Sequence, residues 1–142
     1  MEKECDFCDR EILSSQIIHA GKWASIIYPR NPIIKNHFIL ITNRHIKHIG
    51  DANDSEIIEI RDLFSLLKAS IVDNLKEGGF NLISNYGSSA GQHIDHFHIH
   101  IFLRSFQEKY SPLDVLTKKI EGDRMSKEEC EKNLMEFREL VK

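Results

Sequence analysis

The sequence predicts an α+β domain with a mostly antiparallel sheet of about five strands, one long central helix and a C-terminal helix. Three observations lead to this fold class. Short β-rich segments dominate the middle of the chain, helical periodicity flanks them, and three histidines alternate with apolar residues in a late segment. At 142 residues the chain fits one hydrophobic core, so we expect a single domain over residues 1–142.

The strands and helices can be placed along the chain from local patterns. The β-rich segments cover residues 23–28, 37–42, 80–86 and 96–102. Apolar residues recur at helical spacing from about Asn53 to Lys76, and Gly78 and Gly79 follow as a stop signal. Ser126 begins a capping-box pattern, which predicts a last helix over about residues 126–141.

Composition narrows the function classes. Apolar residues make up 41% and charged residues 29%, as in ordinary soluble globular proteins. The net charge of −3 argues against binding of a nucleic-acid polymer through a basic face. No apolar run approaches the roughly 18–20 residues that cross a bilayer, and the N-terminus lacks the apolar stretch of a secretory signal. We therefore expect a cytoplasmic protein without a membrane partner.

The late strand carries the strongest chemical signal. His96, His98 and His100 alternate with apolar residues, so all three should lie on one face of a strand. Side chains on one face are roughly 6.5–7 Å apart, which allows neighbouring imidazoles to act on one phosphate. A neutral imidazole is a good nucleophile toward phosphorus, and flanking imidazoles can donate hydrogen bonds to the developing charge. The pattern therefore indicates phosphorus chemistry.

The loop before this strand is suited to an anion. Gly87, Gly91 and the two serines between them allow backbone N–H groups to approach a phosphate closely. Gln92 adds an amide and His93 adds another ring. Beside three aligned histidines, this loop favours a phosphate site over an ordinary hairpin connection.

The segment from His96 to Phe102 reads His-φ-His-φ-His-φ-φ, where φ is apolar. This resembles the signature of the histidine-triad (HIT) family. The resemblance covers about residues 1–104 in consistent order, and residues 105–142 form a C-terminal extension. It includes these further positions: Gly91-Gln92, Asn85, His37-Phe38-Ile39-Leu40-Ile41, His45 and Cys5-Asp-Phe-Cys8.

The resemblance implies a nucleotidyl hydrolase or transferase that acts on the α-phosphate of a dinucleoside polyphosphate or a nucleoside phosphoramidate. His98 would form a covalent nucleotidyl-imidazole intermediate, which water then resolves. Carried over position by position, the phosphate contacts would come from His100 and Gln92, with Gly91 in the preceding loop, and the pocket lining from Asn85 and His37. His93 stands where relatives often have Ser or Thr for the leaving group. Homodimers are common in the family, and we expect one here.

One position departs from the family pattern. Relatives often carry an Asp eight residues before the histidine that matches His37, and this Asp binds the ribose hydroxyls. Here the position is Pro29, followed by Arg30. We therefore expect a different ribose contact or none. Arg30 could meet an extra phosphate, although a solvated surface arginine is the simpler interpretation.

The cysteines suggest a metal. Cys5 and Cys8 form a Cys-x-x-Cys pair and Cys130 stands alone, an odd count that argues against a disulfide framework. A redox pair usually lies between a strand and a helix, whereas this one lies at the extreme N-terminus. Two thiolates supply half of a tetrahedral zinc site, and histidines must supply the rest.

Zinc-binding relatives complete such a site with the histidines that match His45 and His96. The resemblance thus implies a structural zinc held by Cys5, Cys8, His45 and His96, with His48 and His93 as reserve ligands. No catalytic metal is expected.

Two rival functions remain open. His-x-His on a strand can hold a catalytic metal that activates water, in which case His96 and His98 would both be ligands. A non-catalytic nucleotide-binding module would bind tightly with negligible turnover.

Overall fold

The computed structural model describes residues 5–106, 114 and 125–142. It contains a five-stranded, fully antiparallel sheet in the order β1-β2-β3-β5-β4. The strands are β1 (Ile17–Ala20), β2 (Ala24–Ile27), β3 (His37–Thr42), β4 (Gly79–Ile83) and β5 (His98–Arg104). The helices are α1 (Arg10–Ser14), α2 (Asp54–Ser70) and α4 (Lys127–Leu140), with 3-10 turns at Ile49–Asp51, Val72–Asn74 and Ser88–Ala90. The predicted α+β class and strand number are confirmed.

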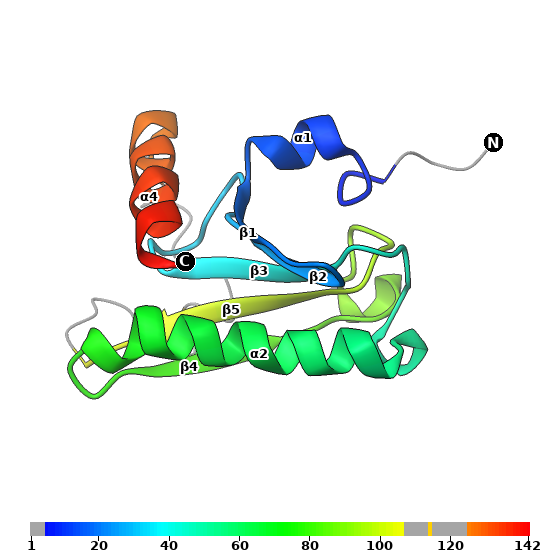
Figure 1. The fold of residues 1–142 in the computed structure, drawn as a ribbon. Helices are drawn as coiled ribbons and strands as arrows, with labels where there is room; N and C mark the ends of the chain where they lie inside the picture. Colours follow the sequence, from blue (N-terminus) through cyan, green and yellow to red (C-terminus); the bar gives the residue numbers. More distant parts are fainter. Residues whose placement is uncertain (1–4, 107–113, 115–124) are drawn as a thin grey trace.

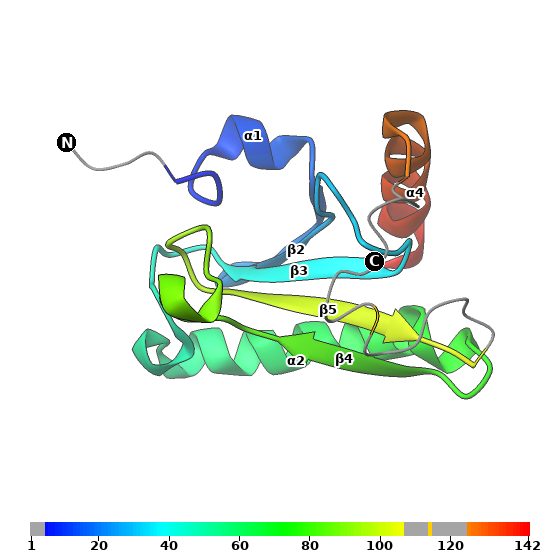
Figure 2. The same ribbon diagram turned by 180° about the vertical axis from the view of Figure 1, so that it is seen from behind.

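The sheet separates two hydrophobic clusters. In both views it lies between α1 and α2 (Figures 1 and 2). On β3, Phe38 and Leu40 pack in the larger cluster with residues of α2 and Phe137 of α4. Ile39 and Ile41 pack on the other side with residues near α1. This alternation follows from the period of two in a strand, and it leaves His37 on the α1 side.

The central helix α2 begins as predicted and ends earlier. Asn53 caps it through a reciprocal capping box with Glu56. The predicted helix to Lys76 is too long, because α2 stops at Ser70 and the chain tightens into the turn at Val72–Asn74. Ile71 and Val72 are both buried there. Neighbouring residues of an α-helix point about 100° apart, so the tighter turn lets both side chains enter the core.

The C-terminal helix confirms its predicted boundaries. Ser126 accepts a hydrogen bond from the Glu129 N–H, as a capping residue does. Phe137 is 2% exposed and packs against Phe38 with ring centroids 4.7 Å apart. Arg138 donates to the carbonyls of Ser14 and Ile17, which fastens α4 to α1 and β1. The rest of the predicted C-terminal extension lies largely outside the described residues.

Two small elements were not placed from the sequence. Helix α1 has five residues and is capped by Asp9, whose carboxylate accepts the N–H groups of Glu11 and Ile12. Strand β1 has four residues and a register shift between Ile17 and His19. Segments this short carry too few periods to be recognised from their pattern.

Candidate functional site

Three histidines gather on the α1 face of the sheet at neighbouring strands. In the β3–β5 ladder, Ile41 lies opposite His98, Ile39 opposite His100 and His37 opposite Phe102. The apolar residues that alternate with the histidines, Phe97, Ile99 and Ile101, belong to the cluster under α2. The alternation predicted for this strand is therefore confirmed, although β5 itself begins at His98.

His98 has a defined tautomer. Its Nδ1 lies 2.7 Å from the backbone carbonyl oxygen of His96. Because a carbonyl only accepts, Nδ1 must donate and Nε2 keeps the lone pair. Burial lowers the pKa of His98, the hydrogen bond to the carbonyl opposes this, and the charge of nearby His93 lowers it further. The ring is therefore neutral at neutral pH.

A relay of hydrogen bonds fixes the proton of His100. The N–H of Ile33 donates to Nδ1 of His37 over 3.0 Å, so this imidazole carries its proton on Nε2. Nε2 of His37 lies 3.0 Å from Nδ1 of His100 and donates to it. The neutral His100 ring then carries its own proton on Nε2. The His37 ring is further held by stacking on Phe102, with centroids 4.3 Å apart.

These imidazoles line a cavity of about 560 Å³. This volume falls within the roughly 300–1,000 Å³ range of small-molecule sites. Among the described lining residues none is acidic, so no carboxylate there opposes a bound phosphate. The polar lining residues are His37, Asn85, His93, His98 and His100 together with Asn31, and Gly91 contributes backbone.

The glycine loop has the backbone that its sequence indicates. Gly87 and Gly91 have φ values of 87° and 92°, a left-handed region that favours glycine. Gln92 is placed differently from the other predicted phosphate contacts. Its Oε1 accepts the Gly87 N–H and its Nε2 donates to the Lys47 carbonyl. Gln92 is not among the described residues that line the cavity. Its amide closes the loop by its hydrogen bond with Gly87.

Pro29 lies on the wall of the cavity at the position where relatives often have an Asp. Arg30, its neighbour, is exposed and lies outside the described lining. The structure thus places the substituted residue in the site and leaves the arginine at the surface.

The four predicted metal ligands meet beside the histidine strand. Ligand atoms of Cys5, Cys8, His45 and His96 all lie within 4.8 Å of one another. Cys8 Sγ lies 3.2 Å from His45 Nδ1 and 3.5 Å from His96 Nδ1. Sulfur and nitrogen ligands of a tetrahedral zinc are roughly 3.6 Å apart, given the usual bond lengths. The donor set and spacing are compatible with zinc.

Contacts outside the four-residue cluster fix the orientation of the His96 ligand. His96 is fully buried, and its Nε2 donates to the Thr42 carbonyl over 2.7 Å, which leaves Nδ1 as the ligand atom. Burial raises the pKa of Cys8 to about 11, and the adjacent Cys5 adds to the shift. A bound metal would stabilise the thiolate form of both cysteines.

The reserve ligands do not join this cluster. His48 accepts the Gly50 N–H and packs against Tyr86. His93 lines the cavity of His98. Neither belongs to the four-residue group among the described side chains.

Phe7 is a site residue that the sequence did not reveal. It stands between the two cysteines and is 5% exposed. Its ring meets His98 edge-on at 5.2 Å and His96 at 5.8 Å. The N-terminal segment that carries Cys5 and Cys8 thus places the Phe7 ring against the His98 imidazole. The only signal in the sequence was a large apolar residue between two candidate ligands.

This chain is similar in sequence to known proteins. A family model described as HIT domain matches residues 10–107. An uncharacterized HIT-like protein of Mycoplasma genitalium is 28% identical over 99 residues, which cover 68% of this chain and 70% of that protein. An adenylylsulfatase of Arabidopsis thaliana is 27% identical over 108 residues, covering 73% of this chain and 54% of that protein. The match therefore spans only about half of the plant protein.

Solved structures share the fold. A hypothetical histidine triad nucleotide-binding protein of Sulfolobus tokodaii has a TM-score of 0.69 at 22% identity, covering 96% of this chain and 91% of that one. A zinc-bound histidine triad family protein of Mycobacterium smegmatis has a TM-score of 0.66 at 19% identity, and the match covers 96% of this chain and 94% of that one. Diadenosine triphosphate hydrolase of Plasmodium falciparum has a TM-score of 0.60 at 24% identity, and the match covers 90% of this chain and 80% of that one. With a family model that spans well over half of its residues, this chain belongs to the HIT family.

Proposed function

We propose that this chain is a nucleotidyl hydrolase or transferase that cleaves a phosphoanhydride or phosphoramidate bond of a nucleotide or dinucleotide. The observation that carries the proposal is the tautomer of His98, whose Nε2 lone pair belongs to a neutral, buried ring lining a cavity without acidic residues in its described part. The names of relatives that hydrolyse diadenosine triphosphate or adenylyl sulfate support the same reaction class.

In the proposed reaction, Nε2 of His98 attacks the α-phosphorus and forms a P–N bond. The P–O or P–N bond to the leaving group breaks, its electron pair stays with the leaving group, and the leaving group takes a proton from solvent water. Water then attacks the nucleotidyl-His98 intermediate, which breaks the P–N bond and releases the nucleoside monophosphate. In both steps the Nε2–H of His100 donates a hydrogen bond to a phosphate oxygen and keeps its proton, and His37 holds His100 in that tautomer.

The other pocket residues have supporting roles. Asn85 and Gly91 line the cavity beside the phosphate position, and His93 lies where it can contact the leaving group. Gln92 acts through the loop that it closes.

Geometry supports this mechanism over a catalytic metal bound by His96 and His98. The two side chains are engaged separately, since His96 directs Nδ1 to the cysteines whereas His98 uses Nδ1 on a backbone carbonyl. The metal cluster contains only one of the two imidazoles. We propose instead that Cys5, Cys8, His45 and His96 hold a structural zinc that fastens the N-terminal segment to the sheet.

The test compares His98→Ala with the parent on a fluorogenic adenosine phosphoramidate and on diadenosine polyphosphates. The variant should lose at least about a hundredfold in kcat, since it lacks the nucleophile. His19→Ala, on β1, is the matched control and should retain parental turnover. A His98→Ala protein that keeps most of the parental rate contradicts the assignment, and a parent that binds the nucleotides without turnover supports the non-catalytic module instead.

A further inference from the structure

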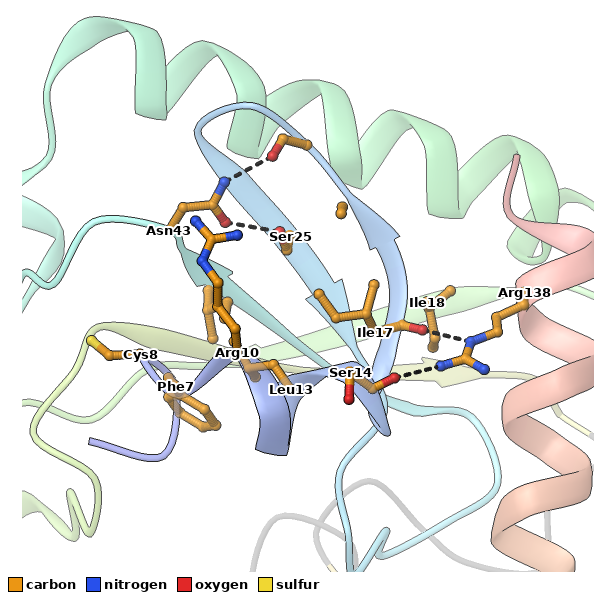
Figure 3. Close-up of a pocket in the computed structure, with 13 residues that line it drawn as sticks. Phe7, Cys8, Arg10, Leu13, Ser14, Ile17, Ile18, Ser25, Asn43 and Arg138 are labelled. Atoms are coloured by element: carbon orange, nitrogen blue, oxygen red, sulfur yellow. Dashed lines mark hydrogen bonds between the residues drawn. The ribbon is translucent and has the colours of Figure 1, made fainter. Parts of the chain in front are cut away.

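A second cavity lies apart from the histidines. It has a volume of about 560 Å³ and lies between α1, the β1–β2 hairpin and Asn43, the residue that follows β3 (Figure 3). Among the described residues, Phe7 alone lines both cavities. One side of the Phe7 region therefore faces His98, and the other opens into a space that the proposed reaction does not use.

Two guanidinium groups face this second cavity. Arg138 binds the backbone carbonyls of Ile17 and Ser14, at 2.7 and 3.1 Å. Arg10 extends from α1 toward Asn43 (Figure 3), and it forms no hydrogen bond or ion pair with the described residues. The described lining contains no Asp or Glu. The charged side chains of the described lining are therefore both cationic, and Arg10 is the one without a hydrogen-bonding or ionic partner among the described residues; the Glu59 carboxylate lies beside Gly21 at the other end of the wall.

Three of the other lining residues, Ser25, Asn43 and Gly21, already bond to one another. Ser25 Oγ donates to Asn43 Oδ1 over 2.8 Å, and Asn43 Nδ2 donates to the Gly21 carbonyl over 2.8 Å. These bonds hold the wall in place without a ligand. Between the two guanidinium groups the lining is apolar, including Leu13, Ile17 and Ile41.

We propose that this cavity binds a small amphipathic anion, a carboxylate or phosphate monoester carried by an apolar chain or ring. Its head group pairs with Arg10, and its apolar body lies against Leu13, Ile17 and Ile41. A guanidinium matches both carboxylate and phosphate oxygens in a bidentate geometry. The volume is within the roughly 300–1,000 Å³ range of small-molecule sites.

The experiment titrates the full chain with octanoate and with octyl phosphate while its backbone amide resonances are recorded. Saturable shifts should appear at Leu13, Ile17 and Ile41, and 1-octanol should bind more weakly because it lacks the charge. The two anions together show whether the head-group site prefers carboxylate or phosphate. An absence of saturation up to several millimolar for both anions overturns the proposal.

Variants test the role of the cation. Arg10→Gln should raise the Kd of both anions roughly tenfold and change octanol binding little, and Arg10→Lys should restore part of the affinity. Arg61→Gln, an exposed arginine of α2, is the control and should leave the Kd unchanged. Equal affinity in Arg10→Gln and the parent overturns the proposal, as do shifts confined to the His98 cavity.

The site is independent of the proposed reaction. His98→Ala should bind octanoate with the parental Kd, because His98 is not among the described residues that line the second cavity. Loss of turnover in that variant with retained octanoate binding separates the two sites. A parallel loss of both contradicts an independent anion site.

Discussion

At the scale of single residues, the site depends on which nitrogen of each imidazole is occupied. His98, His96 and His37 each use one ring nitrogen on a backbone group, namely the carbonyls of His96 and Thr42 and the N–H of Ile33. The backbone thereby selects one tautomer for each ring. The sequence predicted that these rings share a face, because that depends only on the strand period. The tautomer of His96 depends on Thr42, 54 residues away, and those of His98 and His37 depend on the exact path of the nearby backbone, so the residue pattern could not predict them.

Gln92 illustrates the same limit. An amide beside a glycine loop is chemically suited to a phosphate, and the sequence alone favoured that role. In the structure both ends of the amide serve the loop and Lys47, which is 45 residues away. Local sequence showed the available chemistry, whereas the contact with Lys47 could not be predicted from it; the phosphate contact of Gln92 stays a prediction.

Phe7 should act as a positioning residue for His98. Replacing Phe7 with Ala removes the ring edge from the imidazole and costs roughly 3 kcal/mol of stability. We expect kcat/KM to fall roughly tenfold as the ring gains freedom. The imidazole nitrogen resonances of His98 should shift in the same variant. Phe7→Leu, which keeps most of the apolar volume, should recover most of the stability but not the parental His98 resonances.

Unchanged His98 resonances in Phe7→Ala, with a normal zinc content, would show that Phe7 serves only packing.

At the scale of elements, the N-terminal segment is short and depends on its tertiary contacts. Isolated helices of fewer than about 12 residues are marginal in water, and α1 has five. This explains why α1 and β1 escaped prediction whereas α2 and α4 did not. The contacts of Cys8 with His45 and His96 and the hydrogen bonds of the Arg138 guanidinium hold this region.

The zinc prediction belongs to this segment. Protein purified without a histidine tag should contain about one zinc per chain by elemental analysis. Cys5→Ser should lower the content and the Tm, because the segment loses its attachment to the sheet. Cys130→Ser is the matched control, since Cys130 lies outside the cluster. A zinc content near zero in the parent contradicts the structural metal, as does a content unaffected by Cys5→Ser.

The start of α2 carries a pH-sensitive ion pair. Glu56 is buried and accepts from Arg44 at 2.8 Å and from the Asn53 N–H at 2.9 Å. Burial alone raises the pKa of Glu56, but the hydrogen bonds from Arg44 and Asn53 outweigh it and hold the pKa below its ordinary 4.5. The ionised form is therefore favoured in the folded state.

A carboxyl whose folded pKa is lowered stabilises the fold above its unfolded pKa, and this contribution is lost as the pH falls through the folded pKa. Glu56→Gln should therefore lower the Tm near neutral pH, and the difference from the parent should shrink below about pH 4. Thermal unfolding across this pH range measures the effect. A Tm difference that is constant with pH would indicate that the charge of Glu56 contributes nothing.

At the scale of the whole molecule, the two edges of the sheet differ. The β1 edge is fastened to α4 through Arg138 and Ile17. At the β4 edge no further strand is paired in the described structure, and Phe80 and Leu82 are 38% and 48% exposed. An open edge with large apolar side chains tends to pair with another chain. We expect a homodimer in which two copies pair along β4.

Light scattering after gel filtration should give twice the chain mass. Leu82→Lys should shift the protein toward the monomer, because it places a charge in the predicted contact. Leu140→Lys on α4 is a matched control, since Leu140 is also 48% exposed. Equal masses for both variants would exclude β4 as the contact, and a monomeric parent would exclude the dimer.

The strand order has a consequence for synthesis of the chain. Cys8 and His96 are 88 residues apart in sequence but 3.5 Å apart in the fold. A nascent chain that has reached His45 but not His96 has only three of the four side chains of the cluster of Cys5, Cys8, His45 and His96. During translation these thiols are therefore open to oxidation or to a competing metal, and protection begins only once the histidine strand has left the ribosome.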